Sequence, residues 1–404
     1  MNTFSHRQAS VQLRVTDAQG DPIAKQPVSI DQTAHQFLFG CGAGDAFGMQ
    51  AAKSEERRAF HQARAEKWLE LFNYGTLHFY WGRYEPVPGT TIREPMMAAA
   101  HWLRDRGVAL KGHPLCWHTV CADWLLQYSG EEILRRQLER IHREVTDFRG
   151  IIDMWDVINE VVIMPHFDKY DNAVTRICKM KGRLGLVKEV FAAAHESNPD
   201  AALLINDFNL GDGYDVLIDA MLDAGVPIGA IGIQSHQHQG YWGLERLERV
   251  LERYARFGVP LHFTENTLIS GDLMPRHIVD LNDFQVKDWP TTEEGEARQE
   301  KEIVEMYTTL FAHPAVQAIT TWDFTDDCWL NAPAGLIRRD NSEKPSFKAL
   351  KALIHGDWET HEKGVTDENG CVTLTGFKGD YILSAGGKST SFTLSQDGPQ
   401  TVTL

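Results

Sequence analysis

The chain has little that points to a metal, nucleotide or nucleic-acid function. Its six cysteines stand at irregular spacings without a Cys-x-x-Cys pair, so they signal neither a zinc site nor a disulfide framework. No glycine-rich phosphate loop stands out. Asp and Glu number 56 against 40 Lys and Arg, and the formal net charge of −16 disfavours nucleic acid, whose phosphates need a basic surface.

Segments typical of membranes and leaders are also missing. No apolar run reaches the ~18 residues that a spanning helix needs, and the first ten residues lack the apolar core of a secretory leader. We therefore expect no membrane partner. We expect a secreted or periplasmic protein if a leader has been removed, and a cytoplasmic one otherwise. We also expect a monomer that needs no cofactor.

The central part of the chain repeats a short apolar strand, a turn and an amphipathic helix eight times. The expected strands are 35–41, 75–81, 109–116, 151–158, 201–206, 230–234, 260–264 and 316–322. Such alternation predicts a parallel sheet covered by helices. Eight units in this length predict an α/β fold, a closed (β/α)8 TIM barrel over residues 35–356.

Amphipathic stretches and capping signals mark the helices between these strands. One is expected over 131–148, with a capping box at Ser129 and Glu132, and another runs to residue 311 from a box at Thr291 and Glu294. The other helices are expected near 55–72, 93–107, 183–197, 214–224, 244–257 and 345–354.

The two chain ends resemble each other and differ from the middle. Apolar residues alternate with polar ones at Val11, Leu13 and Val15, and again in short runs after residue 370. Neither end alone offers enough strands to bury a face. We predict that residues 1–34 and 357–404 form one small antiparallel β-sandwich, discontinuous in sequence; two separate appendages are the alternative.

Two of the expected barrel strands lead into glutamates, Glu160 and Glu265. A charged group at the end of a buried apolar strand is costly unless it has a function or an ion-pair partner. In a barrel of this kind the active site lies at the carboxyl ends of the strands. Two carboxyl groups are what glycosidic bond hydrolysis requires, so we predict that this pair is catalytic; two structural ion pairs are the alternative.

Amides, imidazoles and indoles gather at the same predicted face. Sugars offer hydroxyls to amides and carboxylates, and apolar ring faces to tryptophan. The candidate substrate-binding residues are His113, Trp117, Asn159, Gln234, His236, Trp322 and Trp329. Core packing is the alternative for Trp322, Trp329 and His113. The His236-x-His238 spacing would suit a metal site, but no further ligand set accompanies it, so we expect no metal.

Six motifs occur in one order along the chain: GHPLCWH from Gly112, WDVINE from Trp155, NDFN from Asn206, QSH from Gln234, TE at Glu265 and TWDFTD from Thr321. In these motifs and their order the chain resembles glycoside hydrolase family 10, the retaining endo-β-1,4-xylanases, over about residues 36–355. Asn-Glu alone recurs in many sugar-hydrolysing barrels, but six motifs in register are specific.

The resemblance implies a role for each candidate. Glu160 would be the general acid/base and Glu265 the nucleophile, about 5–5.5 Å apart in a retaining enzyme. Asn159 would bind the sugar 2-hydroxyl. Gln234 and His236 would hold the nucleophile and the same sugar. His113 and Trp117 would line the pocket, and Trp322 and Trp329 would wall the cleft.

The chain departs from the family pattern at three places. The family's Glu-Asn pair after the second strand falls on His78-Phe79, and its lysine has no counterpart. Thr267 replaces an aspartate that orients the histidine matching His236, and Phe208 replaces a tyrosine. Because of the first change, the sequence does not determine which polysaccharide is the substrate. We expect cleavage of β-1,4-xylan or a related β-linked plant polysaccharide; the same mechanism on another β-glycoside, or a non-catalytic carbohydrate-binding barrel, is the alternative.

Overall fold

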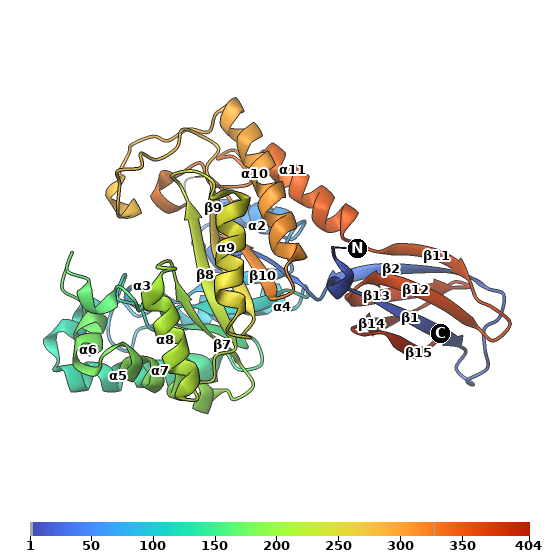
Figure 1. Ribbon diagram of the computed structural model, residues 1–404, viewed down its shortest axis with the longest axis horizontal. Helices are drawn as coiled ribbons and strands as arrows, with labels where there is room; N and C mark the ends of the chain where they lie inside the picture. The colour runs from blue at the N-terminus through green and yellow to red at the C-terminus, as the bar shows by residue number, and fades with distance from the viewer. Residues whose placement is uncertain (1–2, 327) are drawn as a thin grey trace.

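Eight parallel strands close into a barrel in the computed structural model, which describes residues 3–326 and 328–404 (Figure 1). The strands follow the order β10-β3-β4-β5-β6-β7-β8-β9 around the barrel. They are β3 (Leu38–Gly42), β4 (Tyr74–His78), β5 (Ala109–His113), β6 (Met154–Asn159), β7 (Ala202–Asp207), β8 (Ala230–Gln237), β9 (Leu261–Leu268) and β10 (Val316–Thr321). The predicted TIM barrel is confirmed.

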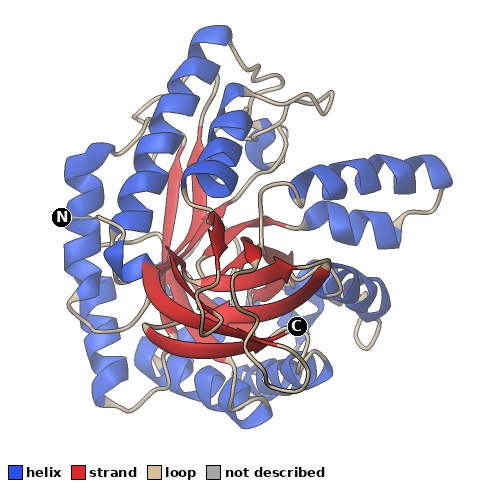
Figure 2. Cartoon of the chain, turned by 90° about the vertical axis from the view of Figure 1, so that its right-hand side faces the viewer, coloured by secondary structure: helices blue, strands red, loops and turns tan. Residues whose placement is uncertain are grey.

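Helices surround this barrel (Figure 2), and α5 shows the apolar stripe by which such a helix packs. In α5, Ile133, Ile141 and Val145 are fully buried at helical spacing, and the Ser129 hydroxyl accepts a hydrogen bond from the Glu132 N–H as its cap. The helices are α1 (Gly44–Ala51), α2 (Glu55–Trp68), α3 (Trp81–Tyr84), α4 (Arg93–Arg104), α5 (Gly130–Asp147), α6 (Ala173–Lys181), α7 (Arg183–Ser197), α8 (Asp212–Asp223), α9 (Gly243–Ala255), α10 (Glu293–Ala312) and α11 (Pro345–Ala352).

Some predicted boundaries were wrong. The expected strand 75–81 ends at His78, and α3 begins at Trp81. The cap of α10 is Thr292, whose hydroxyl accepts from the Gly295 N–H, rather than Thr291, which donates to the Ser270 carbonyl. Helix α1 was missed because it contains two glycines, which lower helix propensity.

The chain ends form two further sheets, as predicted. One has the order β12-β1-β15 and the other β11-β2-β13-β14, so each combines strands from both ends. The strands are β1 (Gln8–Thr16), β2 (Pro27–His35), β11 (His361–Val365), β12 (Cys371–Phe377), β13 (Gly379–Ala385), β14 (Lys388–Leu394) and β15 (Gly398–Thr403). All pairs are antiparallel except β1 with β15, which is parallel. The division into domains at residues 34 and 357 stays a prediction.

The sandwich lies against the end of the barrel where the strands begin. The Arg7 guanidinium donates to the carbonyls of Phe311, His313 and Val316, around the start of β10, at 2.9, 2.7 and 2.6 Å. Trp358 stacks on Phe311 with ring centroids 4.4 Å apart, so it packs the two parts together. Figure 2, seen from this side, has the sandwich strands in front of the ring of helices. The carboxyl ends of the strands lie at the far end.

Candidate active site

Glu160 follows β6 directly and has an unusual backbone conformation. Its φ of 58° lies in the left-handed region, which non-glycine residues rarely adopt. Residues with such strained backbone conformations cluster at functional sites. The Glu160 N–H donates to the Asn206 carbonyl at 2.8 Å, which holds this conformation. The carboxyl group accepts hydrogen bonds from Trp117 Nε1 at 2.8 Å, and from Asn159 Nδ2 and Gln234 Nε2 at 3.2 Å each.

Glu265 lies within β9 and is also buried, with 4% of its surface exposed. Its carboxylate accepts from Asn206 Nδ2 at 2.7 Å and lies 3.0 Å from His236 Nε2. A register shift between Ile233 and Gln234 sets Gln234 opposite Glu265 on the neighbouring strand. The local strand irregularity therefore brings an amide and a carboxylate to one level.

One network of amides links the two glutamates. Asn206 Nδ2 donates to Asn159 Oδ1 at 2.8 Å as well as to Glu265, and Gln234 Nε2 donates to Asn159 Oδ1 at 3.1 Å as well as to Glu160. Asn206 was not among the predicted site residues, although its place at the end of β7 was a signal that could have identified it. Neighbouring strands β6, β7 and β8 thus hold both carboxyl groups in one rigid frame.

The surroundings shift the two carboxyl groups in opposite directions. Burial, and then the charge of Glu265, raise the pKa of Glu160 to about 8. Burial also acts to raise the pKa of Glu265, but the hydrogen bond with His236 and the electrostatic effects of His113, His236 and Lys111 outweigh it and leave this pKa below its usual value. One group is therefore protonated near neutral pH while the other is charged, which is how an acid and a nucleophile divide their roles.

The predicted aromatic residues meet beside this pair. The Trp322 ring lies 5.2 Å from that of His113 and 6.1 Å from that of His236, and the Trp329 ring lies 4.5 Å from His236. The Trp117 indole, which binds Glu160, is half-buried. Every predicted site residue thus lies around one end of the barrel.

Beneath the site, His113 is held by a buried charged cluster. The carboxylate of Asp156 lies 2.7 Å from His113 Nδ1 and 2.7 Å from Lys111 Nζ, and all three side chains are at most 1% exposed. Burial acts to raise the pKa of Asp156, but the charge of Lys111 and the hydrogen bond with His113 outweigh it and lower this pKa below its usual value. His113 is therefore both a core residue and part of the wall of the site.

The departures from the family pattern have different consequences in space. The His78 ring stacks 5.2 Å from that of Tyr80 and lies 5.2 Å from Trp322, and burial lowers its pKa to about 3, so it is neutral. Phe79 is fully buried against Trp155 and takes no part in the site. Of the two residues that replace the family's Glu-Asn pair, only His78 contacts an aromatic residue of the site, Trp322.

The Thr267 side chain contacts His238, although Thr267 pairs with His236 across the two strands. Its hydroxyl lies 3.2 Å from His238 Nδ1, and Nδ1 of His236 has no hydrogen-bond partner in the described part of the chain. Among residues 3–326 and 328–404, no group of three or more His, Cys, Asp or Glu side chains is arranged to hold a metal ion. The His236-x-His238 pair therefore lacks the additional ligands that a metal site would need.

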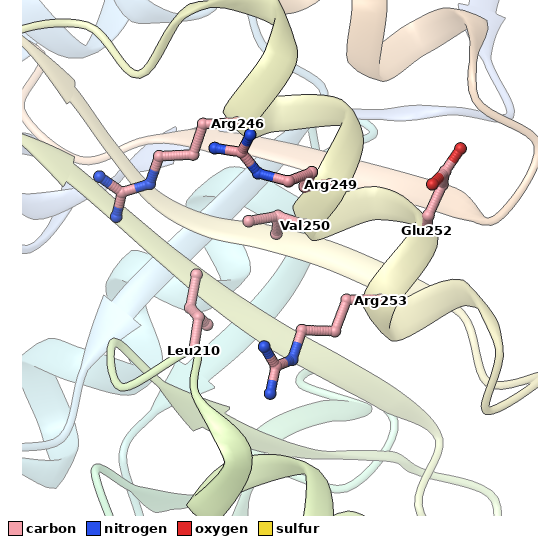
Figure 3. A pocket seen from close by; sticks show the side chains of 6 residues that line it. All are labelled: Leu210, Arg246, Arg249, Val250, Glu252 and Arg253. Carbon is pink, nitrogen blue, oxygen red and sulfur yellow. The ribbon is translucent and has the colours of Figure 1, made fainter.

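A surface hollow lies apart from the two carboxyl groups (Figure 3). It is bounded by Leu210 and by one face of α9, with arginines at 246, 249 and 253. Arg253 is already paired with Asp212 and Asp215, and Arg249 with Glu245.

Within the described residues, no helix has the length and apolar character to cross a bilayer.

The sequence profile of glycosyl hydrolase family 10 matches residues 80–353, which is more than half of the chain. The chain belongs to glycosyl hydrolase family 10. The family match includes both glutamates and the three tryptophans Trp117, Trp322 and Trp329. His78 lies just before the matched residues.

Several named relatives resemble this family 10 chain. It is 29% identical over 254 residues to a beta-1,4-xylanase of Dictyoglomus thermophilum, covering 57% of this chain and 70% of that one. It is 27% identical over 313 residues to an endo-1,4-beta-xylanase/feruloyl esterase of Xylanibacter ruminicola, covering 70% of this chain but only 41% of that protein. The crystal structure of xylanase 10B from Thermotoga petrophila in complex with xylobiose shares its fold, with a TM-score of 0.63 and 21% identity over 80% of this chain and 95% of that one.

Proposed function

We propose that this family 10 protein is a retaining glycoside hydrolase that cleaves internal bonds of β-1,4-xylan or a related β-linked plant polysaccharide. The named relatives are xylanases, and one solved relative holds xylobiose, which supports xylan as the substrate. The observation that carries the proposal is the pair of buried carboxyl groups on one amide network with pKa values displaced in opposite directions.

In the first step, Glu160 gives its proton to the oxygen of the leaving sugar while the Glu265 carboxylate attacks the anomeric carbon. The glycosidic bond breaks, and a covalent bond forms between the sugar and Glu265. The hydrogen bond from Asn206 and the contact with His236 orient the attacking carboxylate. The fixed frame of amides costs no reorganisation as charge moves.

In the second step, Glu160 takes a proton from water, and the water oxygen displaces Glu265 from the anomeric carbon. Esterified Glu265 carries no negative charge, so one cause of the raised pKa of Glu160 is removed in the intermediate. Glu160 therefore becomes a better base when a base is required. The product keeps the configuration of the substrate because two inversions have taken place.

The remaining site residues bind sugar in this proposal. Asn159 and Gln234 present amide groups next to Glu160, where a 2-hydroxyl would lie. Trp322 and Trp329 offer flat apolar surfaces to the sugar rings, and His113 and Trp117 complete the wall. The sandwich acts as a brace, since its aromatic residues Phe377, Tyr381 and Phe392 are buried.

Proton NMR of the first products from soluble xylan tests this function. We expect the β-anomer of the new reducing end to appear first and then to equilibrate. If the α-anomer appeared first, the double displacement would be refuted. If several β-linked polysaccharides were left intact, the non-catalytic barrel would be the better account.

Another β-glycoside is the second candidate substrate, because the chain presents neutral His78 where the family pattern has a Glu-Asn pair. A product profile on xylan, mixed-linkage glucan and mannan separates the two. Xylan as the fastest substrate supports the first candidate, and a higher rate on either of the others supports the second.

A further inference from the structure

Two long loops leave the barrel next to the catalytic pair. One follows β6 and Glu160 and runs to α6; the other follows β9 and runs from residue 269 to α10. Strands β7 and β8 lie between β6 and β9 in the barrel. In Figure 1 the loops approach each other at the end of the barrel that faces away from the sandwich.

An ion-pair bridge joins these loops. The ammonium group of Lys169, from the first loop, lies 2.5 Å from an oxygen of Asp280 and 2.7 Å from one of Asp283, both from the second loop. Asp280 also caps the short helix Leu281–Asp283 by accepting from the Asn282 N–H, which sets its place at the loop tip. The neighbouring Val279 is 98% exposed.

The second loop is a packed structure up to this tip. Met274 and Trp289 are buried in a small apolar cluster of their own, with Ile278 and Phe284 packed against it. The loop is also tied to the turn after β8, since the Met274 N–H donates to the His238 carbonyl at 2.9 Å. Lys169 therefore meets two carboxylates on a firm support.

Strands β7 and β8 lie between the two strands that these loops follow, and Phe208 comes directly after β7. This aromatic side chain is 49% exposed, unlike the buried core around it. The wall of Trp322, Trp329 and Trp117 stands at the other strand ends, around Glu160 and Glu265. A sugar chain that passes from this wall across the two glutamates toward Phe208 would run between the two loops that the bridge joins.

We propose that the bridge from Lys169 to Asp280 and Asp283 closes one end of the substrate cleft, so that short chains react at any time and internal bonds of polymeric xylan are cleaved only while the bridge is open. This inference rests on the proposed function and adds a residue that determines substrate length. A short oligosaccharide enters from the open end, whereas an internal segment of a polymer enters only when the bridge is broken. The pair is partly exposed, with 41% of the Lys169 side chain accessible, so it opens at little cost and is weakened by salt.

The test compares kcat/KM for soluble xylan and for xylotetraose in the wild type, Lys169→Ala and Lys351→Ala. Lys351 is the matched control, because its ammonium group pairs with Glu70 at similar exposure on the outer helix α11, away from the site. We expect the xylan-to-tetraose ratio to rise about two- to fivefold in Lys169→Ala, the range that one exposed ion pair accounts for, and to stay unchanged in Lys351→Ala.

Ionic strength provides a second measurement. Added salt should raise the same ratio in the wild type and leave it unchanged in Lys169→Ala. Equal xylan-to-tetraose ratios in all three proteins, with no salt effect specific to the wild type, would refute the proposed role of the bridge. The proposed function would not be affected by that result. A wild type that released no sugar from either substrate would refute the proposed function and the bridge with it.

Discussion

The raised pKa of Glu160 predicts the pH range in which this enzyme works. With a pKa of about 8, the group is about 99% protonated at pH 6, whereas with its usual value of 4.5 it would be about 3% protonated. Burial beside Glu265 thus makes the acid form roughly 30-fold more abundant at that pH. Above the pKa, the rate should fall about tenfold for each pH unit.

Glu160→Ala separates this acid from other sources of pH dependence. Substrates with poor leaving groups, such as xylo-oligosaccharides, should lose a factor of about 10² to 10⁴ in kcat/KM, because they need the proton. Aryl xylosides with dinitrophenolate leaving groups should react with nearly unchanged kcat/KM, since they leave without a proton. The fall in rate at alkaline pH should disappear in the variant.

The assay is kcat/KM for both substrate types from about pH 4 to about pH 10, because this constant reports the pKa values of the free enzyme. Glu196→Ala, an exposed glutamate on α7, is the control and should behave as the wild type. A wild-type rate that already fell near about pH 5, close to the usual glutamate pKa, would refute the effect of burial. Equal losses on both substrate types in Glu160→Ala would refute the acid role.

Two further predictions concern the nucleophile and the brace. Glu265→Ala should abolish turnover on every substrate while far-UV circular dichroism and the melting temperature stay close to the wild type, and substantial residual activity would contradict the nucleophile assignment. Removing residues 357–404 takes Trp358 and Phe377 out of the cluster with Phe311. Loss of one buried aromatic ring costs about 3–5 kcal/mol of stability, so the melting temperature should fall by several degrees. An unchanged melting temperature would show that the accessory unit does not brace the barrel.

Periodic patterns and capping residues predicted most of this fold. Ser129 capped α5 as expected because a cap depends on residues close in sequence. Thr291 did not cap α10, because Ser270, 21 residues away, takes its hydroxyl instead. A cap can be predicted when its competing partners are close in sequence, and not when the competing group comes from a distant segment.

The site was predicted in its residue types but not in its connections. Strand ends located Glu160 and the tryptophans, since a parallel barrel brings its carboxyl ends together. A register shift between β6 and β7 sets Asn159 opposite Asn206, whose amide both glutamate neighbourhoods share, and no single strand encodes such a shift. The bridge from Lys169 could not be predicted from the sequence either, because it joins loops more than a hundred residues apart.

The role of Glu265 as a covalent nucleophile is tested most directly by mass spectrometry after reaction with a 2-deoxy-2-fluoro-xylobioside that has a good leaving group. The fluorine slows both steps and the leaving group restores the first, so the sugar–enzyme bond accumulates. We predict an intact mass increased by one fluorinated disaccharide and, after digestion, a modified peptide that carries it on Glu265. Inactivation with the label on another residue, or rapid turnover without any adduct, would contradict the account.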